Sequence, residues 1–183
     1  MRIISGIHKG RRIQAPKNLP VRPTTDMAKE ALFNILRHQI EIHDARVLEL
    51  FAGSGNMSYE FCSRGASSSL AVDKHAACTS FIKKTATDLD LNIDVVKADV
   101  FSFLSKHKGK YDLIFADPPY GFSDEEFLKV PELIFQQELL DTNGMLIVEH
   151  SKHSDLSTHS YFKDSRRYGG TVFSFFYHED EEE

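Results

Sequence analysis

The chain has 183 residues, of which 41% are hydrophobic and 27% charged, and its formal net charge is −5. This length suits one domain with a sizeable core, and the composition is typical of a soluble globular protein and not of a disordered or fibrous one. No apolar stretch approaches the ~20 residues that a membrane helix needs, and the first residues lack the apolar core of a signal peptide. We therefore expect a cytoplasmic protein that does not enter a membrane.

A basic extension is predicted for residues 1–40. Residues 2–13 are typical of two short strands joined by a turn, and a helix is predicted from Met27 to Arg37, capped by Thr25 or Asp26. Residues 1–37 hold eight Lys or Arg and two acids, whereas five acids lie in the tail 179–183. The net charge hides this cationic patch, and local patches decide phosphate binding. A merely solvated face is the alternative to RNA contact by Arg2, Lys9, Arg11 and Arg12.

Strands and helices alternate in the main domain, which we place at residues 41–178. Strands are predicted at 46–51, 68–73, 93–97, 111–116 and 144–150, and helices at 56–64, 75–89, 99–106 and 124–138. This alternation indicates an α/β fold with a mostly parallel sheet covered on both faces. Residues 160–167 and 171–177, joined through two glycines, predict a C-terminal hairpin that adds an antiparallel pair. The carboxyl ends of the parallel strands then share one edge of the sheet, where such folds bind ligands.

A glycine turn follows the first of these strands. Gly53 and Gly55 stand between the strand and a helix, an arrangement that lets a ligand approach the backbone and the helix N-terminus. Ser58 occupies the third glycine position of the dinucleotide fingerprint G-x-G-x-x-G. This departure argues against NAD or FAD. It fits S-adenosylmethionine (SAM), which has no pyrophosphate and carries an amino acid at one end.

Three acids lie at or near strand ends. Glu49 is costly to bury unpaired in an apolar strand, and we interpret it as the group that receives the cofactor's ammonium, the alternative being an exposed acid on an edge strand. Asp73 ends the next strand, where an acid usually holds a ribose hydroxyl pair. Asp99 is predicted to accept from the adenine amino group, with Val100 and Phe101 near the ring, and it is also a good helix cap.

The stretch Asp117-Pro118-Pro119-Tyr120 ends the fourth apolar strand. The lone pair of a nucleobase amine is delocalised into the ring, and acceptors for both amine hydrogens localise density on the nitrogen. The Asp117 carboxylate and the Pro118 carbonyl offer two such acceptors, and two prolines fix the backbone in advance. Tyr120 offers a flat face on which a base can stack. An ordinary strand-ending turn is the alternative.

Cysteine and histidine spacing indicates no metal centre. Cys62 and Cys78 fall in predicted helices, and we interpret them as buried reduced thiols. The nine histidines form no H-E-x-x-H or similar ligand set.

With these residues in place, the chain resembles the bacterial small-subunit ribosomal RNA guanine-N2 methyltransferases of the RsmD type, within the class I SAM-dependent methyltransferase fold. The resemblance covers nearly the whole chain, and its N-terminal motifs are the specific part. The residues that carry it are 2–6 with 9–11, 22–26, 30–36, 50–55 and 117–120.

The resemblance implies a Rossmann-like, seven-stranded sheet, SAM as the cofactor and one guanine of 16S rRNA in the small subunit as the substrate. Asp117, Pro118, Pro119 and Tyr120 would hold the guanine, and Arg22 and Thr24 would lie over the cofactor or the target base. The implied SAM contacts are Glu49, Phe51, Ala52, Gly53, Gly55, Asp73, Lys74, Asp99 and Val100. We expect a monomer without a metal ion.

Two departures from the family pattern concern target binding. Met27 stands where the capping helix usually carries an arginine, and Asn56-Met57-Ser58-Tyr59 replaces a smaller, more apolar stretch. Two other functions are kept as alternatives. One is methylation of adenine N6 or cytosine N4 in DNA, against which the lack of a separate target-recognition domain counts. The other is a non-catalytic RNA-binding assembly factor for the ribosome, which the intact Asp117 opposes.

Overall fold

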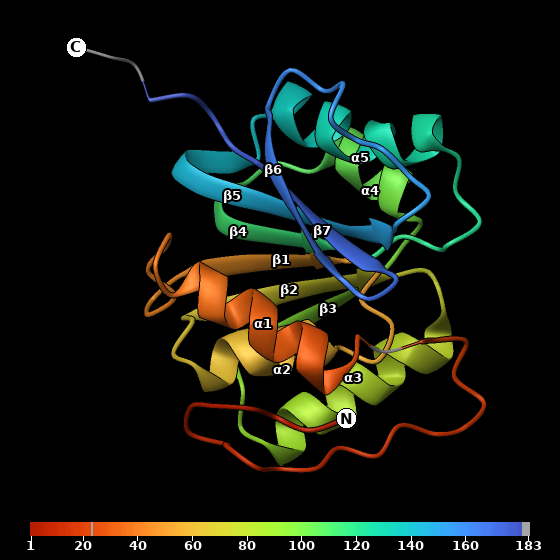
Figure 1. The fold of residues 1–183 in the computed structure, drawn as a ribbon. Coiled ribbons are helices and arrows are strands. Elements are labelled where there is room, and N and C mark those ends of the chain that lie inside the picture. Colours follow the sequence, from red (N-terminus) through yellow and green to blue (C-terminus); the bar gives the residue numbers. More distant parts are fainter. Residues whose placement is uncertain (23, 181–183) are drawn as a thin grey trace.

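A seven-stranded sheet forms the centre of the protein in a computed structural model that describes residues 1–22 and 24–180 (Figure 1). The strand order is β3-β2-β1-β4-β5-β7-β6. The strands are β1 (Arg46–Leu50), β2 (Ser68–Asp73), β3 (Ile93–Lys97), β4 (Tyr111–Ala116), β5 (Leu140–Ser151), β6 (Phe162–Tyr168) and β7 (Thr171–Phe176). The helices are α1 (Asp26–Leu36), α2 (Asn56–Ser63), α3 (Ala76–Asp88), α4 (Val100–Lys106) and α5 (Asp124–Gln136).

The pairing directions confirm the predicted mostly parallel sheet with an antiparallel end. β1 pairs in parallel with both β2 and β4, and β2–β3 and β4–β5 are also parallel. β7 lies antiparallel between β5 and β6. The apolar residues on both faces of β7 are explained by this interior position, since both of its faces are covered.

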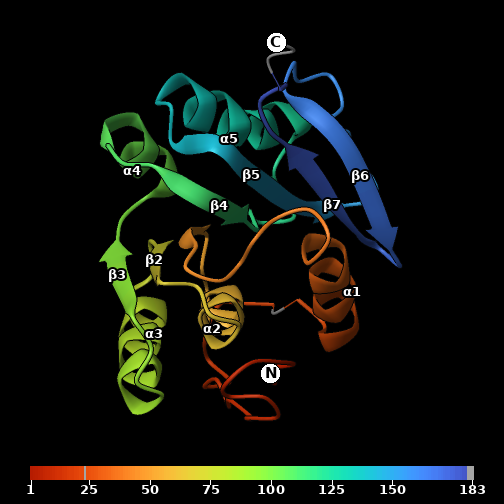
Figure 2. The same ribbon diagram turned by 90° about the vertical axis from the view of Figure 1, so that its left-hand side faces the viewer.

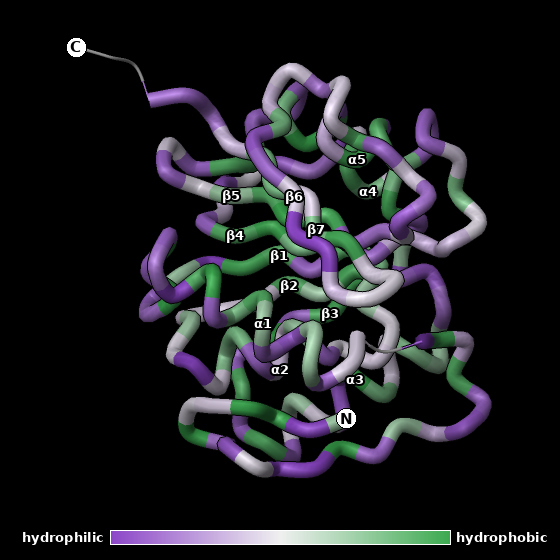
Figure 3. Tube along the Cα trace, in the orientation of Figure 1, coloured by the Kyte–Doolittle hydropathy of each residue, from purple (hydrophilic) through white to green (hydrophobic). Residues whose placement is uncertain are grey.

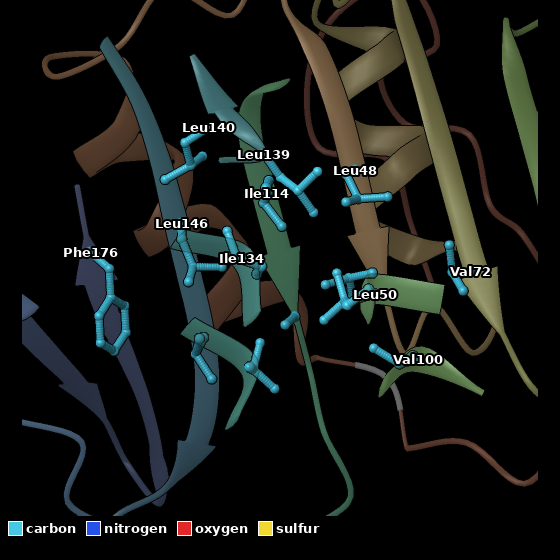
Figure 4. Packing of buried hydrophobic residues seen from close by; sticks show 14 of the residues in the cluster. Leu48, Leu50, Val72, Val100, Ile114, Ile134, Leu139, Leu140, Leu146 and Phe176 are labelled. Carbon is cyan, nitrogen blue, oxygen red and sulfur yellow. The ribbon is translucent and has the colours of Figure 1, made fainter. Parts of the chain in front are cut away.

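Two helical layers cover the two faces of the sheet (Figure 2). Helices α4 and α5 pack on one face against a cluster that includes Leu48, Ile114 and Leu146, drawn in Figure 4. Helices α1 and α2 cover the other face through Leu32, Phe61 and their neighbours, and α3 extends this layer toward β3. Hydrophobic residues concentrate along the central strands, while the outer loops are hydrophilic (Figure 3).

Local signals set several element ends where the sequence predicts them. Thr25 caps α1, because its side-chain oxygen accepts from the Ala28 N–H at 3.2 Å. Gly65, with φ of +104°, follows α2 as a left-handed C′ residue. Asp99 caps α4 by accepting from the Ser102 N–H at 3.0 Å.

The predicted N-terminal hairpin is present but short. Residues 1–3 run antiparallel to residues 11–13, joined by the bridge between Arg2 and Arg12 and by hydrogen bonds from the Ile3 N–H to the Arg11 carbonyl and from the Ile13 N–H to the Met1 carbonyl, both 2.9 Å. The Glu60 carboxylate takes the N–H groups of Ile4 (2.8 Å) and Ser5 (3.2 Å), so these groups do not continue a ladder. Beyond Ile3, hydrogen bonds to the side chain of Glu60 in α2 take the place of backbone pairing across the hairpin.

The fifth strand is longer than the predicted 144–150. The strand begins at Leu140, which pairs with Tyr111, and residues 141–143 then follow with turn-forming side chains. A register shift lies between this pair and the next one, Leu113 with Met145. The irregularity keeps the backbone extended through a polar stretch that the sequence pattern assigns to a turn. Of the predicted acidic tail 179–183, residues 181–183 lie outside the described part of the chain.

Helix α2 is buried along its whole length, although it carries several polar residues. Lys29 of α1 reaches it with a fully buried ammonium, which lies 3.2 Å from the Glu60 carboxylate and donates to Asn56 Oδ1 (2.8 Å) and to the Arg2 carbonyl (2.7 Å). Burial lowers the pKa of Lys29, and the facing Glu60 opposes this shift. The network ties the N-terminal segment, α1 and α2 together.

We predict that Lys29→Met destabilises the protein by about 3 kcal/mol, because it removes the fully buried cation beside the Glu60 carboxylate, which keeps only Arg64 at 2.9 Å. Urea unfolding measures the change. The matched control is Lys84→Ala, which removes an exposed lysine 2.7 Å from Asp88 and should cost less than about 0.5 kcal/mol. If the free energy of unfolding fell equally in the two variants, the buried network would contribute no more than an exposed ion pair.

Candidate functional site

A cavity of about 440 Å³ opens at the carboxyl ends of β1, β2, β3 and β4. This is the edge at which open parallel sheets bind ligands, and the volume lies within the range of small-molecule sites. Its wall is formed by residues 20–22, Thr24 and the segments 51–54, 73–75, 99–101 and 117–120, among others. The predicted residues in the wall are Arg22, Thr24, Glu49, Phe51, Ala52, Gly53, Asp73, Lys74, Asp99, Val100, Asp117, Pro118, Pro119 and Tyr120.

The glycine turn has an unusual backbone. Phe51, Gly53 and Gly55 have φ values of +54°, +56° and +82°, a region that non-glycine residues rarely adopt. A Cβ at Gly53 would lie 2.8 Å from a methyl of Val21, and one at Gly55 would lie 2.8 Å from the Tyr59 ring. Close packing therefore requires glycine at both positions. Gly53 borders the cavity, whereas Gly55 is not among the residues that line it.

Glu49 lies in a central strand and is 3% exposed, which rules out the edge-strand alternative. Its carboxylate accepts from the N–H of Ser58 (2.8 Å), the Ser58 hydroxyl and, over 3.4 Å, the N–H of Met57. Burial raises the pKa of Glu49 to about 7 against these hydrogen bonds. Oε1 of Glu49 accepts only the long hydrogen bond from the Met57 N–H, so it has more acceptor capacity left for a ligand than Oε2.

The Asp73 side chain joins two segments of the cavity wall by hydrogen bonds. Its Oδ2 accepts from the Gly53 N–H and its Oδ1 from the His75 N–H, both at 2.9 Å. The Asp73 side chain thereby fixes the glycine turn beside the end of β2. Asp99 uses Oδ1 for the α4 cap, so its other oxygen remains available beside Phe101.

A possible metal-ligand set was missed by the sequence patterns. Oxygen, nitrogen and sulfur atoms of Asp73, His75 and Cys78 lie within 4.8 Å of one another. Asp73 already accepts two backbone hydrogen bonds, and burial raises the pKa of the Cys78 thiol to about 11. Because a metal ion binds the thiolate, this environment does not favour metal binding.

Asp117 follows β4 and is half buried at the cavity wall, with its backbone N–H donating to the Leu50 carbonyl at 3.3 Å. None of the described residues donates a hydrogen bond to its carboxylate. Burial, and then the nearby Glu149 and Glu49, raise the pKa of Asp117 well above its ordinary value. Tyr120 is 50% exposed at the rim, and the Arg22 guanidinium lies 5.6 Å from its ring centre.

Glu149 was not predicted as a site residue, although it resembles Glu49 in being an acid within an apolar strand. It is 3% exposed, and its Oε2 accepts from the Thr24 hydroxyl at 2.6 Å. Burial raises the pKa of Glu149 to about 7. Asn56 and Phe122 are further wall residues that the motifs did not indicate. Phe122 lies near Phe51 and Phe101, with ring centres 5.8 and 5.9 Å away.

Four predicted RNA contacts lie outside this cavity. Arg2, Lys9, Arg11 and Arg12 are exposed on the N-terminal segment. Arg2 and Lys9 border a separate groove that also contains Arg37 and Arg64. The structure therefore brings Arg22 and Thr24 to the cavity and leaves the other four on an adjacent surface.

The model of one protein family, described as conserved hypothetical protein 95, matches residues 1–177. Ribosomal RNA small subunit methyltransferase D of Escherichia coli K12 is 35% identical over 152 residues, covering 81% of this chain and 71% of that protein. The protein of the same name from Haemophilus influenzae is 30% identical over 163 residues, covering 86% and 82%.

A solved structure of the E. coli protein yhhF superposes with a TM-score of 0.82 at 29% identity and covers 96% of both chains. These matches agree with the resemblance read from the N-terminal motifs and the glycine turn. The chain belongs to the RsmD family of methyltransferases, whose family model spans nearly its whole length.

Proposed function

We propose that this protein transfers a methyl group from SAM to the exocyclic N2 amine of a guanine in 16S rRNA of the small ribosomal subunit. The observation that carries the proposal is the half-buried Asp117 carboxylate, which receives no hydrogen bond from residues 1–22 and 24–180. It lies next to Pro118 in the cavity that the glycine turn borders. A site with unused acceptors in its wall suits a ligand that brings donors. The names of the E. coli and H. influenzae relatives support the ribosomal RNA substrate.

The cavity residues suit SAM. Glu49 Oε1 offers an acceptor for an ammonium group, Asp73 retains acceptor capacity for ribose hydroxyls, and the free oxygen of Asp99 can accept from an adenine amine next to Phe101. Acids outnumber Lys and Arg among the described residues of the cavity wall, which suits an ammonium group better than a pyrophosphate. When bound, SAM supplies an electrophilic methyl group on its sulfonium sulfur.

The protein's own contribution is to hold and polarise the amine. Asp117 and the Pro118 carbonyl accept the two N2 hydrogens, so electron density shifts to the nitrogen. Tyr120 stacks on the base, with Arg22 beside it at the rim. The nitrogen gains the methyl group and loses one proton, which Asp117 is positioned to accept. Orientation of the amine supplies most of the acceleration.

Residues 1–40 serve as the RNA-contact extension of the methyltransferase domain at 41–178, with Arg2, Lys9, Arg11 and Arg12 toward the phosphates. The protein acts as a cytoplasmic monomer. Large hydrophobic side chains exposed among the described residues are few and dispersed, namely Ile7, Met27, Tyr120 and Tyr177. In the same residues no helix is long and apolar enough to cross a membrane.

The first test is transfer of labelled methyl from SAM to small subunits from cells that lack this protein, followed by nucleoside analysis. We expect N2-methylguanosine with the wild-type protein and a rate at least about 100-fold lower with Asp117→Ala, since an acceptor of this type contributes about 10²- to 10⁴-fold. SAM affinity, measured by calorimetry, should change little.

Equal loss of SAM binding in Asp117→Ala would assign this residue to the cofactor instead. Label on DNA but not on subunits would favour the DNA amino-methyltransferase. Normal RNA binding with no methyl transfer to any substrate would favour the assembly factor.

The methyl-transfer rate should fall on the acid side of its pH profile, and this fall should occur at a higher pH than an ordinary aspartate would give. Asp117 can take a proton from the amine only as a carboxylate, and burial with two acidic neighbours raises its pKa. The single-turnover rate should therefore begin to fall, as the pH is lowered, while an ordinary aspartate would still be ionised, and Glu149→Gln should move this fall to lower pH by removing one acidic neighbour. A rate that falls only in the pH range of an ordinary aspartate would contradict the prediction.

The N-terminal cations should contribute to RNA binding through phosphates. Changing Lys9, Arg11 and Arg12 to Ala should weaken binding to small subunits and reduce the slope of log K against log[salt] by about 2 to 3, or about 0.7–0.9 for each phosphate that is no longer neutralised. The matched control, Lys83→Ala and Lys84→Ala on the exposed side of α3, should leave the slope unchanged. The patch is only a solvated surface if both sets give the same slope.

A further inference from the structure

Three acids lie in a row on one face of the sheet. Val47, Phe115 and Ile147 pack together under α1 and α2, and pairing sets Glu49 beside Phe115 and Phe115 beside Ile147. Because side chains alternate along a strand, Asp117 and Glu149 continue this face at the carboxyl ends of the adjacent strands β4 and β5 (Figure 1). Glu49 and Asp117 border the cavity, whereas Glu149 is covered by Thr24.

Thr24 is the link between Glu149 and the cavity. It is 8% exposed, it borders the cavity with Asp117 and Pro118, and its backbone carbonyl accepts from the Asn56 side chain at 3.3 Å. A hydroxyl has one hydrogen, and that of Thr24 is donated to Glu149 over 2.6 Å. The Thr24 oxygen can then offer only lone pairs to a ligand.

The part of the cavity wall proposed to hold the base therefore presents three acceptors: the Asp117 carboxylate, the Pro118 carbonyl and the Thr24 oxygen. The Thr24 hydroxyl is not available there as a donor. Guanine has donors at both N2 and the adjacent ring nitrogen N1. Adenine and cytosine also have an exocyclic amine, but the ring nitrogen beside it is an acceptor. An acceptor placed next to the amine site would meet a second acceptor in those bases, and a buried unpaired group is costly.

We propose that Thr24 selects guanine by accepting its N1–H, and that Glu149 is a positioning residue that makes Thr24 an acceptor by holding its hydroxyl proton. This inference rests on the proposed function and adds the group that distinguishes guanine from other amine-bearing bases. At pH 8, above the pKa of about 7 that burial gives Glu149, this carboxylate can accept but not donate. The Thr24 hydroxyl is then fixed in one orientation.

The test uses 2-aminopurine, which retains the exocyclic amine of guanine but has an acceptor at N1. The guanosine that the wild-type protein methylates is first located on small subunits. It is then replaced by 2-aminopurine riboside in 16S rRNA made by ligation, and subunits are reconstituted around this RNA. Single-turnover methylation at pH 8 is measured on both substrates, together with SAM affinity.

The wild-type protein should methylate guanine about 10- to 100-fold faster than 2-aminopurine, the range expected when one buried group is left unpaired. Thr24→Val should slow the reaction on guanine and bring this ratio to within about 3-fold of unity. Thr24→Ser should restore the ratio, and Glu149→Gln should lower it only partly, because the glutamine amide no longer forces the hydroxyl to donate. Adding Glu149→Gln to Thr24→Val should change the ratio no further.

The matched control is Thr87→Val, at an exposed threonine of α3 whose hydroxyl donates to the Lys83 carbonyl. It should leave both rates and their ratio unchanged. A Thr24→Val protein that slows both substrates by the same factor would overturn the inference, since Thr24 would then only support the fold. So would a wild-type ratio near unity, or a failure of Thr24→Val to improve the relative use of 2-aminopurine. Absence of methylation on any guanosine would instead remove the proposed function.

Discussion

The parallel pairing of β1 with β4 is the constraint on which the candidate site depends. It sets Leu50 beside Ala116, so the glycine turn and the Asp-Pro-Pro-Tyr stretch leave the sheet at the same height, and the Asp117 N–H reaches the Leu50 carbonyl at 3.3 Å. Some 60 residues separate these segments in the chain. A slip of one residue in this register would turn Asp117 to the face covered by α4 and α5, away from Glu49. Cofactor and target groups can meet only because the apolar pattern of both strands fixes that register.

Helix α2 joins the basic N-terminal segment to this site. Its Asn56 side chain contacts Lys29, which in turn donates to the Arg2 carbonyl, and it also holds the Thr24 carbonyl. Ile3 and Ile13 of the segment are buried with residues of α2 and α3. The first 40 residues therefore share the core and the hydrogen bonds of the main domain. These contacts fix the position of the proposed RNA-contact segment relative to the cavity, which would suit the placement of one base.

Sequence patterns predicted those parts of the fold that local chemistry determines. The strands 68–73, 93–97 and 111–116 have the predicted bounds, since each is a short, mostly apolar run with an acid or a cation at its last position or directly after it. The Thr25 cap and the Gly65 helix end are equally local signals. The hydrogen bonds of Ile4 and Ser5 to Glu60 were not predictable, because their partner lies 55 or more residues away and is itself an acid that a pattern assigns to solvent. Glu149 was missed because no motif surrounds it, and its partner Thr24 is 125 residues distant.

The row of acids on the sheet is best explained by ligand binding and not by folding. One position earlier along the same face, β1, β4 and β5 place Val47, Phe115 and Ile147 in the core. Burial raises the pKa values of Glu49 and Glu149 to about 7. A carboxyl whose pKa is raised on folding binds its proton more tightly in the native state, so these groups lower the stability progressively as the pH rises from their ordinary values toward neutrality. Apolar side chains at these positions would make the protein more stable. Glu49 and Asp117, which border the cavity, can still accept from donors that a cofactor and a base bring, and Glu149 acts on the cavity through Thr24.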